Sequence, residues 1–292
     1  MKRNFLIISI ALLFGFQLFA QEAEVQEVQK DRPVRAPFAC GIIIDNQTTV
    51  IPSVKTLEFQ IQHKFGDIGN GFSDLFGLYA PGANIRMALN YVPMKNLQVG
   101  YGLSRVNMYS DFSAKYTILE QTRQNTVPVA VGVFANMAID GRPDESFGDN
   151  YQFTNRFSYF SQLIVGRRFN DAVSVQANVS FTHYNMVEPE QDHDKISVGF
   201  NGRVNITAQS SILLQYDIPL KVKGITEHNE FLNPAKPNLG FGWEIRTSTH
   251  AFHIYMGSAD GMIPQHNALY NQNDWTDGDL MFGFSIIRLW SF

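Results

Sequence analysis

The sequence is poor in several residue types and patterns, and each shortage excludes a class of protein. Cys40 is the only cysteine among 292 residues, so the chain can form no internal disulfide, and we expect no cysteine-based metal cluster. A formal net charge of −4, with no basic run that carries interleaved aromatics, argues against a nucleic-acid partner. We therefore expect no cofactor and no metal, and we interpret Cys40 as a structural residue.

Long apolar runs are also missing. The longest, from Phe5 to Ala20 behind a basic start, is shorter than the roughly 20 residues that a membrane helix needs. A basic start, an apolar core and a small residue are typical of a secretory signal peptide, which we expect to be cleaved near Ala20. A lipid-anchored precursor would place a cysteine after that cleavage, where Gln21 stands. The sequence therefore predicts an exported protein.

No proline-, serine- or glycine-rich linker interrupts the chain after residue 40. The polar, charged stretch from Gln21 to Pro37 reads instead as a flexible lead-in. We expect a signal peptide over residues 1–20, a periplasmic lead-in over 21–53 and one folded domain over 54–292.

Alternation of apolar and polar residues with a period of two dominates that domain. In 55–65, Leu57, Phe59 and Ile61 alternate with Glu58 and Gln60, as in a strand with one apolar and one wet face. Twelve segments share this texture: 55–65, 84–92, 97–105, 111–122, 127–139, 155–169, 173–184, 195–206, 211–220, 237–247, 250–258 and 279–292.

The connections between these segments mostly alternate between long and short, as they do in barrels of the bacterial outer membrane. In the last segment, Trp290 and Phe292 share the apolar face, which resembles the C-terminal signal read by the barrel-assembly machinery. The pattern predicts a closed antiparallel transmembrane β-barrel of about 12 strands in the outer membrane, surrounded by lipid and lipopolysaccharide. A soluble β-sandwich or ligand-binding barrel is the alternative, with its apolar faces turned inward.

Several segments also resemble one family. Leu57-Glu-Phe-Gln-Ile-Gln-His-Lys-Phe-Gly66, Ala83-Asn-Ile-Arg86, Arg156-Phe-Ser-Tyr159 and Trp275-Thr-Asp-Gly-Asp279 are similar to the DUF5777 family of β-barrel proteins, found mainly in Bacteroidota. The resemblance runs from about residue 54 to the end. It implies a barrel and a membrane location, and it implies no activity and no catalytic residues.

If the apolar faces meet lipid, the opposite faces line the lumen. Cations outnumber anions on those faces, and rings of Arg and Lys favour anions in pores. We therefore expect a narrow channel or transporter for small solutes, and the cationic faces favour anions among them. The alternative is a closed structural or accessory barrel, sealed by ion pairs, that supports a surface complex. The predicted lumen residues are Lys64, Arg86, Lys115, Arg156, Arg168, Arg203, Arg246, Glu58, Asp217 and Glu244.

A lipid hydrolase is the least favoured function. His63 and His183 fall on the lipid side near the outer rim, but no serine lies at a defined spacing from either, and a nucleophile needs its base within hydrogen-bond reach. We predict no enzyme. Asp274, Asp277 and Asp279 lack the spacing of an EF-hand and are interpreted as turn residues.

Two apolar segments remain outside the strands. Residues 66–83 are too apolar for a solvated loop, and we expect them either to fold inward as a constriction or to form a short helix at the barrel mouth. The stretch Gly41-Ile-Ile-Ile-Asp45 precedes the first strand, and we expect it to pack into the lumen from the periplasmic side.

Overall fold

The computed structural model describes residues 31–292 except 36, 81–82, 190 and 226–233. The chain divides into Met1–Arg32 and Pro33–Phe292, and every element described below belongs to the second unit. The predicted signal peptide and residues 21–30 and 36 of the lead-in lie outside the described residues, so cleavage near Ala20 stays a prediction.

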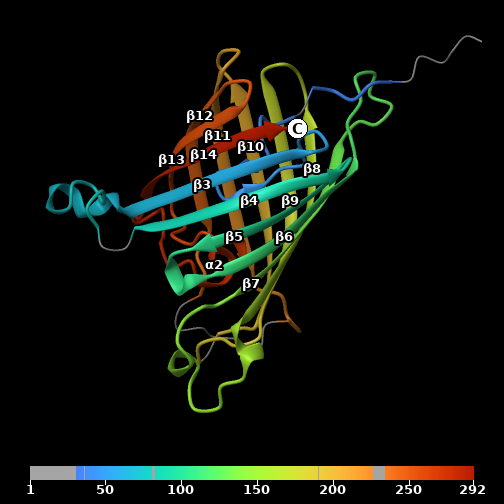
Figure 1. Ribbon diagram of the computed structural model, residues 1–292. Helices are drawn as coiled ribbons and strands as arrows, with labels where there is room; N and C mark the ends of the chain where they lie inside the picture. Colours follow the sequence, from blue (N-terminus) through green and yellow to red (C-terminus); the bar gives the residue numbers. More distant parts are fainter. Residues whose placement is uncertain (1–30, 36, 81–82, 190, 226–233) are drawn as a thin grey trace, which may run out of the picture. The chain divides into compact units, whose positions relative to one another are not determined.

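Twelve strands form one closed barrel in which each strand pairs antiparallel with its neighbours in sequence (Figure 1). The last strand, β14, pairs with the first, β3, and this pairing closes the ring. The prediction of a closed twelve-stranded antiparallel barrel is confirmed. The strands are β3 (Thr56–Asp67), β4 (Asn84–Met94), β5 (Leu97–Ser104), β6 (Ser110–Leu119), β7 (Ala130–Ile139), β8 (Phe157–Arg168), β9 (Val173–Tyr184), β10 (Asp194–Asn205), β11 (Ser210–Leu220), β12 (Asn238–Arg246), β13 (His250–Gly257) and β14 (Met281–Ser291).

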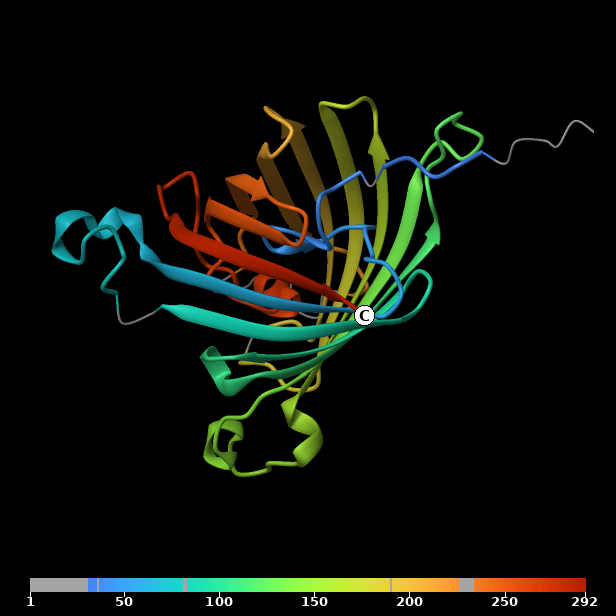
Figure 2. The same cartoon turned by 45° about the horizontal axis from the view of Figure 1, so that its top comes forward.

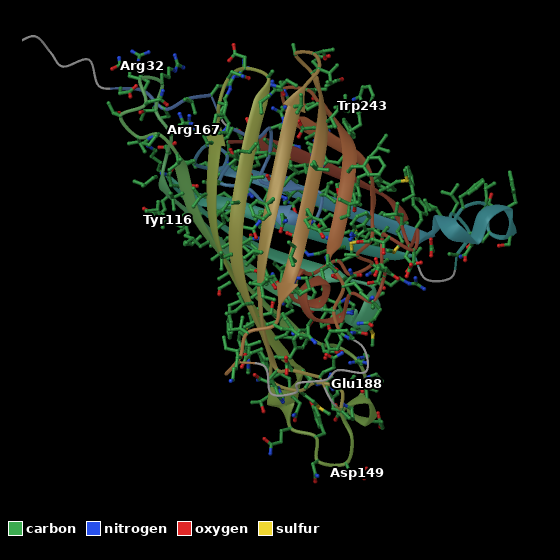
Figure 3. The ribbon with its side chains drawn as sticks, turned by 180° about the vertical axis from the view of Figure 1, so that it is seen from behind. Arg32, Tyr116, Asp149, Arg167, Glu188 and Trp243 are labelled. Carbon is green, nitrogen blue, oxygen red and sulfur yellow. The ribbon has the colours of Figure 1, made fainter. Side chains whose placement is uncertain are left out.

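The period-two pattern decides which face of each strand points outward. In β9, the exposed Val179 and Phe181 alternate with the buried Gln176, Ser180 and Thr182. Side chains on the outer surface are apolar in most strands, and Figure 3 labels two that illustrate this, Tyr116 and Trp243. A soluble barrel buries its apolar faces, whereas this barrel exposes them and encloses polar ones, as barrels that sit in lipid do.

The two ends of the barrel differ in their connections. We call the end with connections such as 169–172 and 247–249 the turn end, and the opposite one the loop end. The loop end carries the longer connections, including 140–156, with the 3-10 helices η3 (Asp144–Phe147) and η4 (Phe153–Arg156), and 258–280, with helix α2 (Pro264–Tyr270). Figure 3 labels Asp149 and Glu188 in loops at that end and Arg167 towards the other.

Among the described residues, no helix is both long and apolar enough to cross a membrane.

The apolar loop between β3 and β4 does not enter the barrel. It contains a 3-10 helix, η1 (Ile68–Ser73), and extends away from the strands (Figure 1). Phe72 and Tyr79 are 87% and 77% exposed, so the predicted inward fold is wrong, and a short helix is present instead. Gly66 and Gly77 bind each other through a backbone hydrogen bond of 2.9 Å, and this contact folds the loop onto itself. Other segments occupy the lumen.

Candidate functional site

Charged side chains of the barrel wall lie flat against the wall. Arg86 on β4 donates two hydrogen bonds to Asp111 on β6, at 2.9 Å from Nε and 2.7 Å from Nη2. Gly102 lies on the intervening strand β5, and a Cβ at this position would come within 2.5 Å of both groups. The missing side chain therefore lets the ion pair cross β5 without rising into the lumen.

The same device recurs on the other side of the barrel. A Cβ at Gly199 on β10 would lie 2.2 Å from Oδ1 of Asp217 and 2.6 Å from Nδ2 of Asn178, which belong to the two flanking strands. Arg203 on β10 and Glu244 on β12 likewise pair along the wall at 2.7 Å, with one strand between them. These polar groups lie along the wall and leave the centre of the lumen for other parts of the chain.

The centre is filled first by residues 37–50, which we call the plug segment (Figure 2). It folds as a small hairpin of β1 (Ile42–Ile43) and β2 (Asn46–Gln47), turned at Ile44 with φ of 53°. A β-branched residue rarely adopts this left-handed conformation, so surrounding contacts must hold it. Ile44 is fully buried and packs in one cluster with four residues of the plug segment and the wall: Phe38, Ile43, Leu213 and Tyr255.

Polar anchors hold the plug segment to strands around the ring. Asp45 forms an ion pair of 2.8 Å with Lys64 on β3, and its backbone N–H donates to Gln215 on β11 at 2.9 Å. Asn46 donates to Asp217 at 2.7 Å. On the opposite side, Lys115 on β6 donates to the carbonyl of Gly41 at 2.9 Å. The expectation that Gly41–Asp45 packs inside the lumen is confirmed.

A second insertion enters from the loop end and consists of residues 258–272, which we call the cap segment. Lys64 donates to the carbonyls of Ala259 and Gly261 at 2.6 and 3.1 Å, so this one ammonium group binds both inserted segments. In α2, Gln265 donates to Asn136 on β7 at 2.9 Å, and Ile263 packs in a buried cluster with Tyr109 and Ala138. Burial lowers the pKa of His266 in this helix below its ordinary value.

The two inserted segments meet inside the barrel. The cavity between Asp45 and Asn46 of the plug segment and Pro264 and Asn267 of the cap segment has a volume of about 30 Å³. That volume corresponds to about one water molecule. Two stretches of chain therefore fill this part of the lumen.

A wider cavity lies at the turn end. Its volume is about 820 Å³, and it opens among the connections that follow β6, β8 and β10. Arg168 at its edge pairs with Asp171 at 2.6 Å, and Arg246 donates to the carbonyl of Ala208 at 3.2 Å. We call this cavity the arginine basin, because five guanidinium groups line it: Arg35, Arg123, Arg168, Arg203 and Arg246.

The structure separates the predicted lumen residues into three places. Arg156 lies at the loop end, where it pairs with Asp144 and packs 4.6 Å from the ring centre of Phe147. Arg168 and Arg246 line the arginine basin, and Arg203 reaches it from the wall. Glu58, Lys64, Arg86, Lys115, Asp217 and Glu244 lie on the inner wall with partners on neighbouring strands or the plug segment. Contact of any of them with a solute stays a prediction.

The interior shows no cationic excess. Among the described residues, five buried cations face five buried anions, and the partly buried Asp45 and Asp217 add two further anions there, so the cationic excess expected from the strand faces is found in the arginine basin instead. The cations are Lys64, Arg86, Lys115, Lys195 and Arg203, and the anions are Glu58, Asp111, Asp140, Asp192 and Glu244.

Sequence reasoning missed three polar residues of the site. Asp45 was missed because it follows the apolar residues Ile42–Ile44, and only the apolar character of that segment was interpreted. Asp111 was missed because it is the first residue of its predicted strand, where the alternating pattern begins. His253 alternates correctly towards the lumen in β13 and is fully buried, so the period-two pattern contained the signal for it. His253 lies 3.2 Å from Glu244 and 3.6 Å from Cys40.

The two outward histidines show no hydrolase geometry. The ring of His63 stacks on Phe284 at 5.3 Å, and His183 binds Asp194 and Asn185. In the described part of the chain, neither imidazole is hydrogen-bonded to a serine hydroxyl.

Asp274 accepts hydrogen bonds from the backbone and hydroxyl of Thr276, which lower its pKa to about 2, so the turn interpretation is confirmed there.

Comparison with known proteins places the chain in a family. The KdgM porin is similar at 6% identity with a TM-score of 0.45, over 81% of this chain and 99% of that one. An outer membrane channel from Pseudomonas putida F1 is similar at 9% identity with a TM-score of 0.49, over 83% of this chain and 97% of that one. No curated protein matches by sequence. The family model for a membrane-bound β-barrel domain, DUF5777, matches residues 38–290, and the chain belongs to this family.

Proposed function

We propose that this protein is an outer-membrane channel for small solutes that the plug segment and the cap segment close. One observation carries the proposal: the wall pairs its charges flat against itself, and the lumen is filled by chain segments. A barrel that served only as a scaffold would not need a lumen so wide that two inserted segments must fill it. A channel gains a gate, because a segment of chain can move out of the lumen while the wall stays intact.

The anchors of the plug segment fit a movable element. Besides two apolar clusters, one around Ile44 and one around Cys40 and Ile42, they are hydrogen bonds among amide, ammonium, carbonyl and carboxylate groups that water can replace. Because a hydrogen bond to a charged group contributes only about 1.5–3 kcal/mol net, each polar anchor is modest alone. We propose that the plug segment leaves by the turn end, where the preceding residues Val34 and Arg35 line the arginine basin.

The preferred solute follows from the arginine basin. Of the five guanidinium groups around about 820 Å³, Arg168 and Arg203 pair with Asp171 and Glu244, and the remaining three raise the local concentration of anions at the turn end, while the interior has no cationic excess. We propose small anions as the preferred class. The proposal includes no catalysis, since the histidines on the outer face stack on aromatic rings or bind polar side chains.

The placement in the outer membrane belongs to the same proposal. We assign the turn end to the periplasm and the longer loops to the outside, as is usual for outer-membrane barrels. The exposed apolar residues of the wall then contact lipid, and the outer loops face lipopolysaccharide. The apolar face of β14 with Phe292 is proposed as the segment that the barrel-assembly machinery binds.

A closed accessory barrel is the second candidate. The observation in its favour is the buried ion pair of Lys64 with Asp45, whose side chains are 2% and 7% exposed. A buried pair of this kind fixes one arrangement of the plug segment, as a permanent closure would require.

Conductance in planar bilayers separates the two candidates. We expect the full chain to open rarely and a variant lacking both the plug segment (37–50) and the cap segment (258–272) to conduct steadily, because the two segments together fill the lumen. Heat-modifiable migration in gels is the control that the shortened barrel has folded. A folded variant that never conducts would contradict the channel and support the accessory barrel.

A further inference from the structure

Three buried side chains with metal-binding atoms meet where the plug segment touches the wall. Cys40 belongs to the plug segment, Glu244 to β12 and His253 to β13, and all three are at most 6% exposed. One ligand atom of each lies within 4.8 Å of the other two. Nε2 of His253 is 3.6 Å from Sγ of Cys40 and 3.2 Å from Oε2 of Glu244.

These separations fit the edges of a metal coordination tetrahedron. Zinc binds nitrogen and oxygen at about 2.0 Å and sulfur at about 2.3 Å, so neighbouring ligand atoms stand about 3.3–3.6 Å apart. The two distances from Nε2 of His253, 3.2 and 3.6 Å, fall close to this range. Little movement is therefore needed to place one ion in contact with all three side chains.

The surroundings of the three ligands support such a site. Arg203 donates to Oε1 of Glu244 at 2.8 Å, which fixes the carboxylate and leaves Oε2 turned towards His253. A cavity of about 340 Å³ among the turn-end connections has Cys40 in its lining, so a path to the thiol exists from that end. The mixed set of sulfur, imidazole and carboxylate ligands suits zinc and the neighbouring divalent metals.

We infer that Cys40, Glu244 and His253 form a three-ligand site for Zn²⁺ that ties the plug segment to the barrel wall. On binding, the thiol of Cys40 loses its proton to solvent and a sulfur–zinc bond forms, while His253 binds through a deprotonated Nε2. The ion, one thiolate and one carboxylate sum to zero charge. Such a site avoids the large cost of an uncompensated buried charge. The ligand set leaves a fourth position for water.

Burial and the negative charge of Glu244 raise the pKa of the Cys40 thiol, so the thiol is protonated without metal. The site as a binding site is independent of the proposed channel, whereas its use as a latch on the plug segment rests on that proposal.

Titration of the purified full chain with Co²⁺, followed by competition with Zn²⁺, tests the site. Cys40 is the only cysteine, so a cobalt–thiolate absorption band reports its coordination directly. We expect one equivalent to bind, and the changes Cys40→Ser and His253→Gln to weaken binding by about tenfold or more. His63→Gln, which alters an outer-face histidine, is the matched control and should leave binding unchanged.

The inference fails if no thiolate band appears, or if Cys40→Ser binds Zn²⁺ as tightly as the unchanged chain. A second readout covers variants that fold poorly: maleimide labelling of Cys40 in the unchanged chain should slow when Zn²⁺ is added, and unchanged labelling would also overturn the site. Zinc binding without any channel conductance would leave the metal site standing and remove its role as a latch.

Discussion

Arg86 and Asp111 pair at 2.7 Å with side chains only 10% and 0% exposed, so their contact depends on the strand that lies between them. Removing one partner of a buried ion pair costs about 3–5 kcal/mol, because the other charge stays buried and unpaired. Gly102 provides the space for this contact.

Gly102→Ala therefore tests the flat wall pair. Its Cβ would come within 2.5 Å of both charged groups, and we expect a loss of about 1–3 kcal/mol in the free energy of unfolding. Gly166→Ala is the control on the same inner face, since its nearest neighbour, Oγ1 of Thr49, lies 3.6 Å away. Urea unfolding in detergent micelles measures both variants, and equal midpoints would show that the pair does not need the glycine.

The cluster of Cys40, Glu244 and His253 could be predicted from the sequence only in part. The alternation along β13 and β12 puts His253 and Glu244 on the inner face, and this much follows from the period of two. Cys40 and His253 are separated by 213 positions in the sequence, so no local pattern predicts their contact. The interpretation of Cys40 as a structural residue followed from its isolation in the sequence.

Among the elements, α2 of the cap segment carries a titratable group in a buried place. His266 packs 5.5 Å from Tyr270, and its Nδ1 has no hydrogen-bond partner among the described residues. Burial lowers its pKa below the ordinary 6.5; Lys64 and Arg142 act in the same direction, and Asp260 and Asp140 oppose them. The neutral ring is therefore the form that the folded cap segment favours.

Acid should loosen the cap segment for this reason. Below pH 6.5 the unfolded segment takes up a proton that the folded one resists, so the stability of the fold falls as the pH falls. The protection of the amides over 263–270, corrected for the intrinsic exchange rate at each pH, should fall between about pH 7.5 and about pH 5, and more so than in His266→Gln. Equal pH dependence in the two proteins would exclude His266 as the cause.

Strands and inserted segments differ in how well the sequence predicts them. The bounds of β9 match the predicted 173–184, because alternation along one strand decides its faces. The cap segment was expected only as part of an outer loop, since its contacts with Asn136 and Tyr109 come from distant strands. The loop at 66–83 was too apolar for solvent, yet composition does not determine whether such a loop turns inward or outward.

The barrel's cationic excess lies at the turn end, whereas the interior has none. If the protein conducts, selectivity should therefore depend on the basin and not on the wall. Changing Arg35, Arg168 and Arg246 together to Gln in the variant lacking both the plug segment and the cap segment should shift the reversal potential in a salt gradient towards cation preference. Arg156→Gln, at the loop end, is the control, and an equal shift in both would contradict the role of the arginine basin.

A reversible disulfide between the plug segment and the barrel wall tests whether the plug segment is a removable gate. A Cβ at Gly132 on β7 would lie 3.7 Å from Cα and 3.5 Å from Cγ2 of Thr49, close enough for a disulfide. In Thr49→Cys/Gly132→Cys with Cys40→Ala, we predict opening events in planar bilayers under reducing conditions, their loss on oxidation, and their return with reductant. Identical conductance in the oxidised and reduced states would show that the plug segment is not the gate.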